Sequence, residues 1–137
     1  MNTSILFHEL HQKVRLLNKE LNERLKDFDL FSSQWTILYT LKNHGSMSQT
    51  EIWRYLNVEA PTVTRTLSRL EDTGWIMRDE GKDKREKIVR LTKKAEEQLS
   101  KIEKEISRFE EDMLKELSEN DQKTLLLLLR KLGTGYK

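Results

Sequence analysis

The chain has no cysteine, a single proline and five glycines among its 137 residues. Without cysteine, disulfide bonds, thiol catalysis and sensing by cysteine oxidation are excluded. No apolar run approaches the roughly 20 residues that cross a bilayer, and the first residues lack the pattern of a secretion signal. These absences predict a cytoplasmic protein without a membrane partner, and the length predicts one domain with a substantial core.

Residues that could form an active site are also scarce. The three histidines are not accompanied by a nucleophile–base pair, and no glycine-rich phosphate loop precedes a helix. His8 and His11 lie three residues apart beside Glu9, but no second ligand cluster follows, so packing or a ligand pocket explains them better than a metal site. We therefore expect no enzyme activity, no metal and no cofactor.

Charge is unevenly distributed, although the net charge is only +2. Residues 60–95 hold 10 basic and 6 acidic side chains, a net charge of +4, whereas residues 96–137 hold 8 and 10, a net charge of −2. A basic patch confined to one segment is typical of a surface that binds duplex DNA, whereas membrane binding more often uses an amphipathic terminal helix. Double-stranded DNA is therefore the expected partner.

The single proline opens a short helix within that basic segment. Pro61 suits the first helical turn and Gly74 suits the position after the last, so a helix is predicted from about Pro61 to Thr73. Three apolar residues share one of its faces: Val63, Leu67 and Leu70. Another face carries hydroxyls and guanidinium groups without a carboxylate: Thr62, Arg65, Thr66 and Arg69. Such a face can contact phosphates and guanine edges in a major groove, although alone it is equally typical of a solvated helix.

A charged hairpin follows the helix at once. Residues 75–79 and 87–91 carry aromatic and β-branched side chains in partial alternation, and the turn signal 80–86 separates them. A cationic helix joined to a basic hairpin has the layout of a winged helix, in which the hairpin contacts the DNA backbone or minor groove. The basic side chains of this wing are Lys82, Lys84, Arg85 and Lys87. Asp83 is expected to orient the guanidinium of Arg85.

Helical patterns surround the winged segment on both sides. Residues 5–28 predict one long helix with an apolar seam, and a second helix is expected from Ser32 or Ser33 to Gly45. The capping box Ser48-Gln49-Thr50-Glu51 opens a third helix, and the connection 57–60 suits the turn of a helix-turn-helix. Thr92 is expected to cap a long helix with an apolar seam close to a heptad pattern, and Ser118 to cap a final one.

The final helix contains five successive leucines, which must point in every direction around it. Burial on all sides needs more surface than the winged core leaves free, so a second copy of the chain is the simplest solution; packing within one chain is the alternative. The residues expected to form the dimer are apolar and lie on the first and the last two helices: Leu6, Leu10, Met113, Leu125, Leu126, Leu129 and Leu132.

Four segments together resemble the MarR family of bacterial transcriptional regulators. They are Pro61-Thr62-Val63-Thr64-Arg65, Leu70-Glu71-Asp72-Thr73-Gly74-Trp75-Ile76, Asp83-Lys84-Arg85 and Val89-Arg90-Leu91-Thr92. Their spacing is more specific than any one segment, and the resemblance covers nearly the whole chain. Two positions depart from the family pattern. Ala95 stands where glycine is frequent, and Trp53 stands where a small residue is usual, which is expected to alter helix packing.

The resemblance implies a homodimeric regulator, most often a repressor although activation is also known, that binds an inverted-repeat operator. It adds Thr64 to the expected DNA-binding residues, which are Thr62, Thr64, Arg65, Arg69, Lys82, Asp83, Lys84, Arg85 and Lys87. It also implies a pocket for an aromatic or phenolic effector between the winged domain and the terminal helices. The amphipathic side chains placed to line it are His8, His11, Trp35 and Tyr39, which would serve equally well as core residues.

The sequence as a whole predicts a mainly α fold with a small β-hairpin wing (α+β). Residues 1–137 are expected to form a single MarR-type domain, with a winged helix-turn-helix core at 32–92 and dimerisation helices at 1–29 and 93–137. The function expected is sequence-specific DNA binding in transcription control. The alternative is a winged-helix protein-interaction module, but such a surface would be expected to show aromatic or aliphatic anchors.

Overall fold

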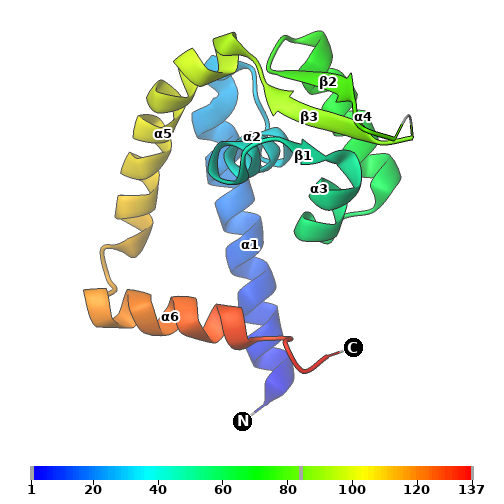
Figure 1. Ribbon diagram of the computed structural model, residues 1–137. Helices are drawn as coiled ribbons and strands as arrows, with labels where there is room; N and C mark the ends of the chain where they lie inside the picture. The colour runs from blue at the N-terminus through cyan, green and yellow to red at the C-terminus, as the bar shows by residue number, and fades with distance from the viewer. Residues whose placement is uncertain (1, 84, 137) are drawn as a thin grey trace.

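A computed structural model describes residues 2–83 and 85–136. These residues form six α-helices and three short strands in the arrangement of Figure 1. The helices are α1 (Thr3–Leu25), α2 (Ser32–His44), α3 (Gln49–Leu56), α4 (Ala60–Asp72), α5 (Lys93–Leu114) and α6 (Glu119–Lys131). A 3-10 turn, Lys26–Phe28, continues α1. The predicted fold class, mainly helical with a β wing, is confirmed.

The strands form one small antiparallel sheet. They are β1 (Met47–Ser48), β2 (Ile76–Glu80) and β3 (Lys87–Leu91), in the order β1-β3-β2. The pairing of β2 with β3 runs from Ile76 opposite Leu91 to Glu80 opposite Lys87, which is the predicted hairpin with its first strand moved by one residue. The sequence does not predict β1, because its two residues form a strand only by pairing with β3.

Local capping explains where most helices begin. At α3 the Ser48 Oγ accepts from the N–H of Glu51 at 3.1 Å, and a Glu51 carboxylate oxygen accepts from the N–H of Ser48 at 2.9 Å. That hydrogen bond to the Ser48 backbone lowers the pKa of the exposed Glu51 carboxyl. Helix α2 begins at Ser32, one of the two predicted positions. The expectation that Ser32 or Ser33 caps it was wrong, because the N-cap is Phe31 and Gln34 Oε1 accepts from the Phe31 N–H at 2.9 Å.

One apolar core joins the winged segment to α1 and α5. Its fully buried side chains come from every one of these elements: Leu25, Leu38, Ile52, Leu67, Leu70, Ile76, Val89 and Ile102. Trp53 is half-buried at the edge of this core, and its ring lies 5.4 Å from the Arg54 guanidinium. The large side chain is thus accommodated beside the core and needs no gap within it.

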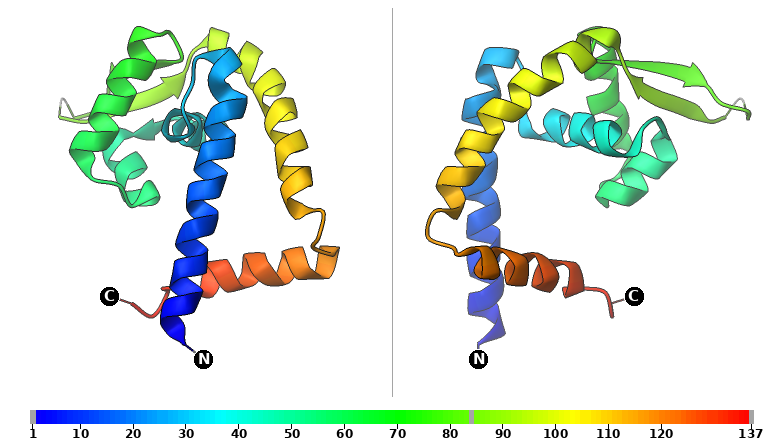
Figure 2. Two further views of the ribbon diagram at one scale, coloured as in Figure 1. Left: turned by 180° about the vertical axis from the view of Figure 1, so that it is seen from behind. Right: turned by 60° about the vertical axis from the view of Figure 1, so that its left-hand side comes forward.

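The terminal helices extend away from the winged core. Figures 1 and 2 show α1 as a long rod, α5 running beside its C-terminal half, and α6 crossing near its N-terminal half. Within the described chain α6 buries none of its residues, and its five leucines are 44–64% exposed. In the described ranges no helix combines the length and the apolar character needed to span a membrane.

Candidate nucleic-acid interface

Helix α4 separates an apolar face from a polar one, as the sequence predicts. Val63, Leu67 and Leu70 are buried in the core, whereas Thr62 and Arg65 are exposed. The helix begins at Ala60 with proline in its first turn and ends at Asp72, followed by Gly74 at φ +83°, a left-handed conformation that favours glycine. A full helical face of hydroxyls and guanidinium groups therefore reaches solvent.

Side-chain hydrogen bonds on that face decide which atoms are free to recognise DNA. The Thr64 hydroxyl donates to the Ala60 carbonyl at 2.9 Å, and the Thr66 hydroxyl donates to the Thr62 carbonyl at 3.0 Å. Both hydroxyls therefore retain acceptor capacity. Arg65 Nη2 lies 3.4 Å from Thr62 Oγ1, a long contact that leaves most of the guanidinium donors free.

Helix α3 packs beside α4 through a short turn. Asn57 ends α3 in the left-handed conformation, with φ 55°, and its N–H donates to the Arg54 carbonyl at 3.3 Å. Helix α4 begins three residues later, and the Val63 N–H donates to the Glu59 carbonyl at 3.2 Å. This turn fixes the crossing of the two helices, so the predicted helix-turn-helix is present.

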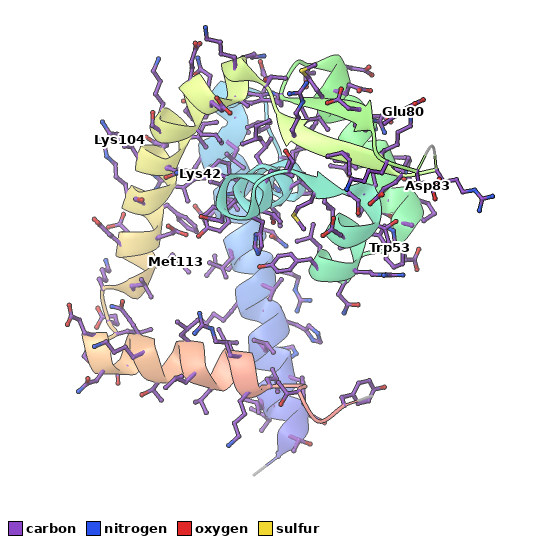
Figure 3. All side chains as sticks on the ribbon, viewed as in Figure 1. Lys42, Trp53, Glu80, Asp83, Lys104 and Met113 are labelled. Carbon is purple, nitrogen blue, oxygen red and sulfur yellow. The ribbon has the colours of Figure 1, made fainter. Side chains whose placement is uncertain are left out.

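The tip of the hairpin is held by its own backbone. The Gly81 N–H donates to the Glu86 carbonyl at 2.8 Å, and the Glu86 N–H donates to the Asp83 carbonyl at 2.9 Å. The prediction that Asp83 orients the Arg85 guanidinium is replaced by a different contact, since Asp83 Oδ1 accepts from the main-chain N–H of Arg85 at 3.1 Å. Asp83 therefore shapes the loop, and Figure 3 shows this residue at the end of the hairpin that lies away from α5.

The other wing residues lie where the sequence predicts. Lys82, Arg85 and Lys87 are exposed, with Lys87 in the last pair of the hairpin ladder. Lys84, also predicted to bind DNA, lies outside the described residues. The structure thus places two basic surfaces, the outer face of α4 and the wing, on neighbouring elements that share one core.

Sequence reasoning missed Arg78, which joins the wing to both helices of the helix-turn-helix. Its guanidinium donates to Glu71 Oε1 at 2.8 Å, to Ser68 Oγ at 3.2 Å and to Gln49 Oε1 at 3.2 Å. The hydrogen bond from Arg78 lowers the pKa of the Glu71 carboxyl. One signal was available: Arg78 is a charged residue in the middle of a predicted strand, where an unpaired charge would be unfavourable.

A second missed contact ties α4 to α5. The Lys94 ammonium donates to the Thr73 carbonyl at 2.9 Å and lies 4.8 Å from the centre of the Trp75 ring. The Thr92 hydroxyl, at the predicted N-cap of α5, donates to the Gly74 carbonyl at 2.6 Å. The C-terminal end of α4 is therefore held by the first turn of the long terminal helix.

The residues predicted to form an effector pocket separate into two pairs. Trp35 and Tyr39 line a cavity of about 390 Å³ between α2 and α5, with their ring centres 6.1 Å apart. His8 and His11 are exposed on the N-terminal half of α1 and do not line that cavity. The structure brings the two aromatic residues together and leaves the two histidines elsewhere.

Only some of the residues predicted to form the dimer lie together in the structure. Five of them line one groove of about 470 Å³ between α1 and α6: Leu6, Leu10, Leu125, Leu129 and Leu132. Leu126 is exposed outside this groove, and Met113 is half-buried on α5. The groove and its surroundings form the largest set of exposed apolar side chains in the described chain.

A helix-turn-helix followed by an antiparallel hairpin defines the winged helix-turn-helix class. Comparison with known proteins agrees with this class: the sequence model of the MarR family matches residues 30–87. An uncharacterized HTH-type transcriptional regulator of Bacillus subtilis, YwoH, is 50% identical over 125 residues, which cover 91% of each chain. The chain belongs to the MarR family of transcriptional regulators.

Solved structures support the same assignment. A mutant MarR from E. coli complexed with operator DNA superposes with a TM-score of 0.81 at 27% identity, covering 94% of this chain and 91% of that one. A MarR protein from Peptoclostridium difficile has a TM-score of 0.88 at 23% identity over 98% and 88% of the two chains, and shows the shared fold. Because the family and the Bacillus relative are transcriptional regulators, the prediction that the chain is not an enzyme is confirmed.

Proposed function

We propose that this cytoplasmic regulator binds an inverted-repeat operator as a homodimer and represses transcription. The observation that carries the proposal is the exposed hydroxyl and guanidinium face of α4 beside the basic wing, with both surfaces fixed to one core. The E. coli relative complexed with operator DNA supports duplex DNA as the partner. Phosphate contacts by the wing would set the register, and base contacts by α4 would select the sequence.

Base reading falls to four residues of α4: Thr62, Thr64, Arg65 and Arg69. Arg65 and Arg69 each carry a planar fork that can pair with O6 and N7 of guanine. Thr64 retains its acceptor capacity and its methyl group, so it suits an exocyclic amine or a thymine methyl. Arg85 on the wing suits a narrow A·T-rich minor groove, where the negative potential is enhanced.

Homodimerisation is supported by the exposed apolar surface of the terminal helices. The groove between α1 and α6 is lined almost entirely by leucine, and large solvent-exposed apolar patches are rare on monomers. A twofold dimer built on these helices would present two copies of α4 to successive major grooves, roughly 34 Å apart. The proposed domain organisation therefore keeps residues 32–92 for DNA and residues 1–29 and 93–137 for association.

Control by a small molecule is the third part of the proposal. The cavity at Trp35 and Tyr39 lies between the winged core and α5. The hydrogen bonds from Thr92 and Lys94 to the carbonyls that follow α4 connect α5 to α4. A ligand that shifts α5 relative to α2 would therefore change the orientation of the recognition helix. Release of the operator is the expected consequence.

Selection from a library of random duplexes tests the proposal directly. Sequences retained by the full chain at physiological salt should converge on an inverted repeat whose half-sites are centred about one helical turn apart. Each half-site should contain guanine opposite the predicted arginine positions. Retention of duplexes without any shared sequence would favour the alternative, a winged-helix module that does not read DNA sequence.

A further inference from the structure

Trp53 stands where the family pattern has a small residue, and the contacts proposed for α4 and the wing make no use of it. It is half-buried on α3, packs at the edge of the core and lines an open groove of about 600 Å³. Arg54 lines the same groove from α3, and Ala60 and Pro61 line it from the first turn of α4. The groove therefore lies between the two helices of the helix-turn-helix, at the end of α4 that contacts base edges in this class.

The Arg54 guanidinium lies against the ring of Trp53, with 5.4 Å between its central carbon and the ring centre. Consecutive residues of a helix point about 100° apart, so the helix does not by itself bring these two side chains together. A guanidinium within about 6 Å of an indole ring is attracted by the negative charge of the ring face. The contact therefore holds Arg54 beside the groove that α3 shares with α4.

Arg54 is the only basic side chain of α3. Two other polar side chains of this helix already have partners, since Gln49 accepts from Arg78 and the Glu51 carboxylate accepts from the Ser48 N–H. Arg54 is exposed, and the ion pairs formed within 2–83 and 85–136 do not include it. Its guanidinium is therefore available to an anion outside the chain.

Glu59, the N-cap residue of α4, also lines the groove. A carboxylate near the guanidinium offsets its attraction for a free ion, so the groove is not built to retain inorganic phosphate alone. A duplex held by α4 is different, because the first helix of a helix-turn-helix crosses the DNA backbone and lies beside its phosphates. Figure 3 shows Trp53 on the side of the molecule away from α5, as is the wing residue Asp83.

We propose that Arg54 binds a phosphate of the operator backbone and that Trp53 is a positioning residue, which holds the guanidinium toward that phosphate. The inference rests on the proposed function and adds to it a backbone contact from α3, besides those of the wing. The Trp53 ring restricts a flexible side chain before DNA arrives, so less conformational freedom is lost on binding. Because phosphates carry no sequence information, the pair adds affinity without choosing bases.

Substitution of Arg54 tests the phosphate contact. Arg54→Gln removes the charge of an exposed side chain, so the fold should be unaffected. It should weaken binding to operator and to scrambled duplex alike, by about tenfold for a dimer with two such contacts. The dependence of log K on log salt should flatten by about one unit for each protomer.

A matched control and a neutral phosphate sharpen this test. Arg108→Gln removes an arginine charge from α5, where the side chain is 78% exposed, and should change neither the affinity nor the salt dependence. Replacing single operator phosphates by uncharged methylphosphonates should reveal a position that weakens binding by the parent but not by Arg54→Gln. Unchanged affinity and salt dependence for Arg54→Gln, or the same loss for Arg108→Gln, would overturn the phosphate contact.

A double-mutant cycle tests the role of Trp53. Trp53→Leu removes the aromatic face but keeps an apolar side chain at the edge of the core, and should weaken DNA binding about threefold. The same change in an Arg54→Gln protein should weaken binding no further, because no guanidinium is left to position. Trp53→Phe keeps a ring and should retain most of the parent affinity. Equal losses from Trp53→Leu in the two backgrounds would show that Trp53 acts by packing or by its own contact, and would overturn the positioning role.

The outcomes separate this inference from the proposed function. A parent that prefers its operator, together with an Arg54→Gln protein that binds and responds to salt as the parent does, overturns the inference alone. A parent that binds all duplexes equally overturns operator reading, whereas the scrambled duplex still decides whether Arg54 neutralises a phosphate. A parent that binds no duplex overturns both.

Discussion

Arg78 and Glu71 connect the wing to the recognition helix through an ion pair with 2.8 Å between Nη2 and Oε1. Arg78 is on β2 and Glu71 is in the last turn of α4. The same guanidinium also donates to Ser68 on α4 and to Gln49 on α3. A single side chain therefore sets the position of the hairpin relative to both helices that would approach DNA.

Replacing Arg78 by methionine should destabilise the protein and weaken operator binding together. Methionine keeps an apolar stem but leaves three acceptors, on Glu71, Ser68 and Gln49, without their donor. Because Glu71 is 38% exposed, water compensates part of the loss, and we expect about 1–2 kcal/mol in the free energy of unfolding. Urea unfolding at one protein concentration measures the change.

The Arg90–Asp79 pair on the same hairpin provides the control. Its side chains are 50% and 45% exposed and 2.7 Å apart, so Arg90→Met should cost less than about 1 kcal/mol. Equal losses for the two variants would contradict the view that Arg78 has a special positioning role.

Lowering the pH should reduce the contribution of Glu71 to the free energy of unfolding. The hydrogen bond from Arg78 lowers the pKa of this carboxyl in the folded protein, so its stabilising effect is present above the pKa of the unfolded chain and is lost as pH falls through the folded pKa. The difference in unfolding free energy between the parent and Glu71→Gln should therefore shrink from neutral pH to below about pH 4. A difference that stays constant or grows would show that Glu71 acts by packing alone.

The wing should be needed for DNA binding and not for folding. Arg85 is exposed at the tip of the hairpin, so Arg85→Ala should weaken operator binding while the dimer and the thermal unfolding midpoint change little. Gel shifts and differential scanning calorimetry measure the two quantities. Operator binding as tight as that of the parent at matched salt would remove Arg85 from the interface.

The last helix should be needed for association. Leu126 and Leu129 are each 48% exposed in the single chain, and replacing both by glutamate would put two carboxylates into an apolar contact. Such burial costs several kcal/mol, so the dimer should dissociate. Light scattering reads the mass, and a variant that remains dimeric and folded would place the contact elsewhere.

Local signals were enough to predict the recognition helix and the wing. Pro61 and Gly74 mark the two ends of α4 to within about two residues, and the turn signal 80–86 marks the loop between β2 and β3. These features depend on the backbone preferences of residues that are close together in the sequence, so they can be predicted from the residue types alone. For the same reason the capping residues Thr92 and Ser118 were predicted correctly.

Features that depend on distant residues could not be predicted in the same way. Strand β1 exists because Met47 pairs with Val89, 42 positions along the chain. The contact between Arg78 and Gln49 spans 29 positions, and nothing in the local pattern of either residue indicates it. The residues predicted to line an effector pocket illustrate the same limit: residue type suggested four of them, but only Trp35 and Tyr39 line the cavity between α2 and α5.

The central claim is that α4 reads the base sequence whereas the wing binds phosphates. Substitutions at two exposed residues test it. Arg65→Ala on α4 should reduce the preference for operator over scrambled duplex and relax specificity at one base pair per half-site, since pairing with guanine provides about 1–3 kcal/mol of discrimination. Lys82→Ala on the wing should weaken binding to both duplexes alike. It should also flatten the dependence of log K on log salt by about one unit for each phosphate that the wing no longer neutralises.

Binding titrations of parent, Arg65→Ala and Lys82→Ala on operator and scrambled duplex, at several salt concentrations, are the most direct measurement. We predict that Arg65→Ala lowers the affinity for the operator only, and that Lys82→Ala lowers the affinity for both duplexes equally and in a salt-dependent way. Equal reductions for both variants on both duplexes would contradict it, because the face of α4 would then bind DNA by charge without reading its sequence.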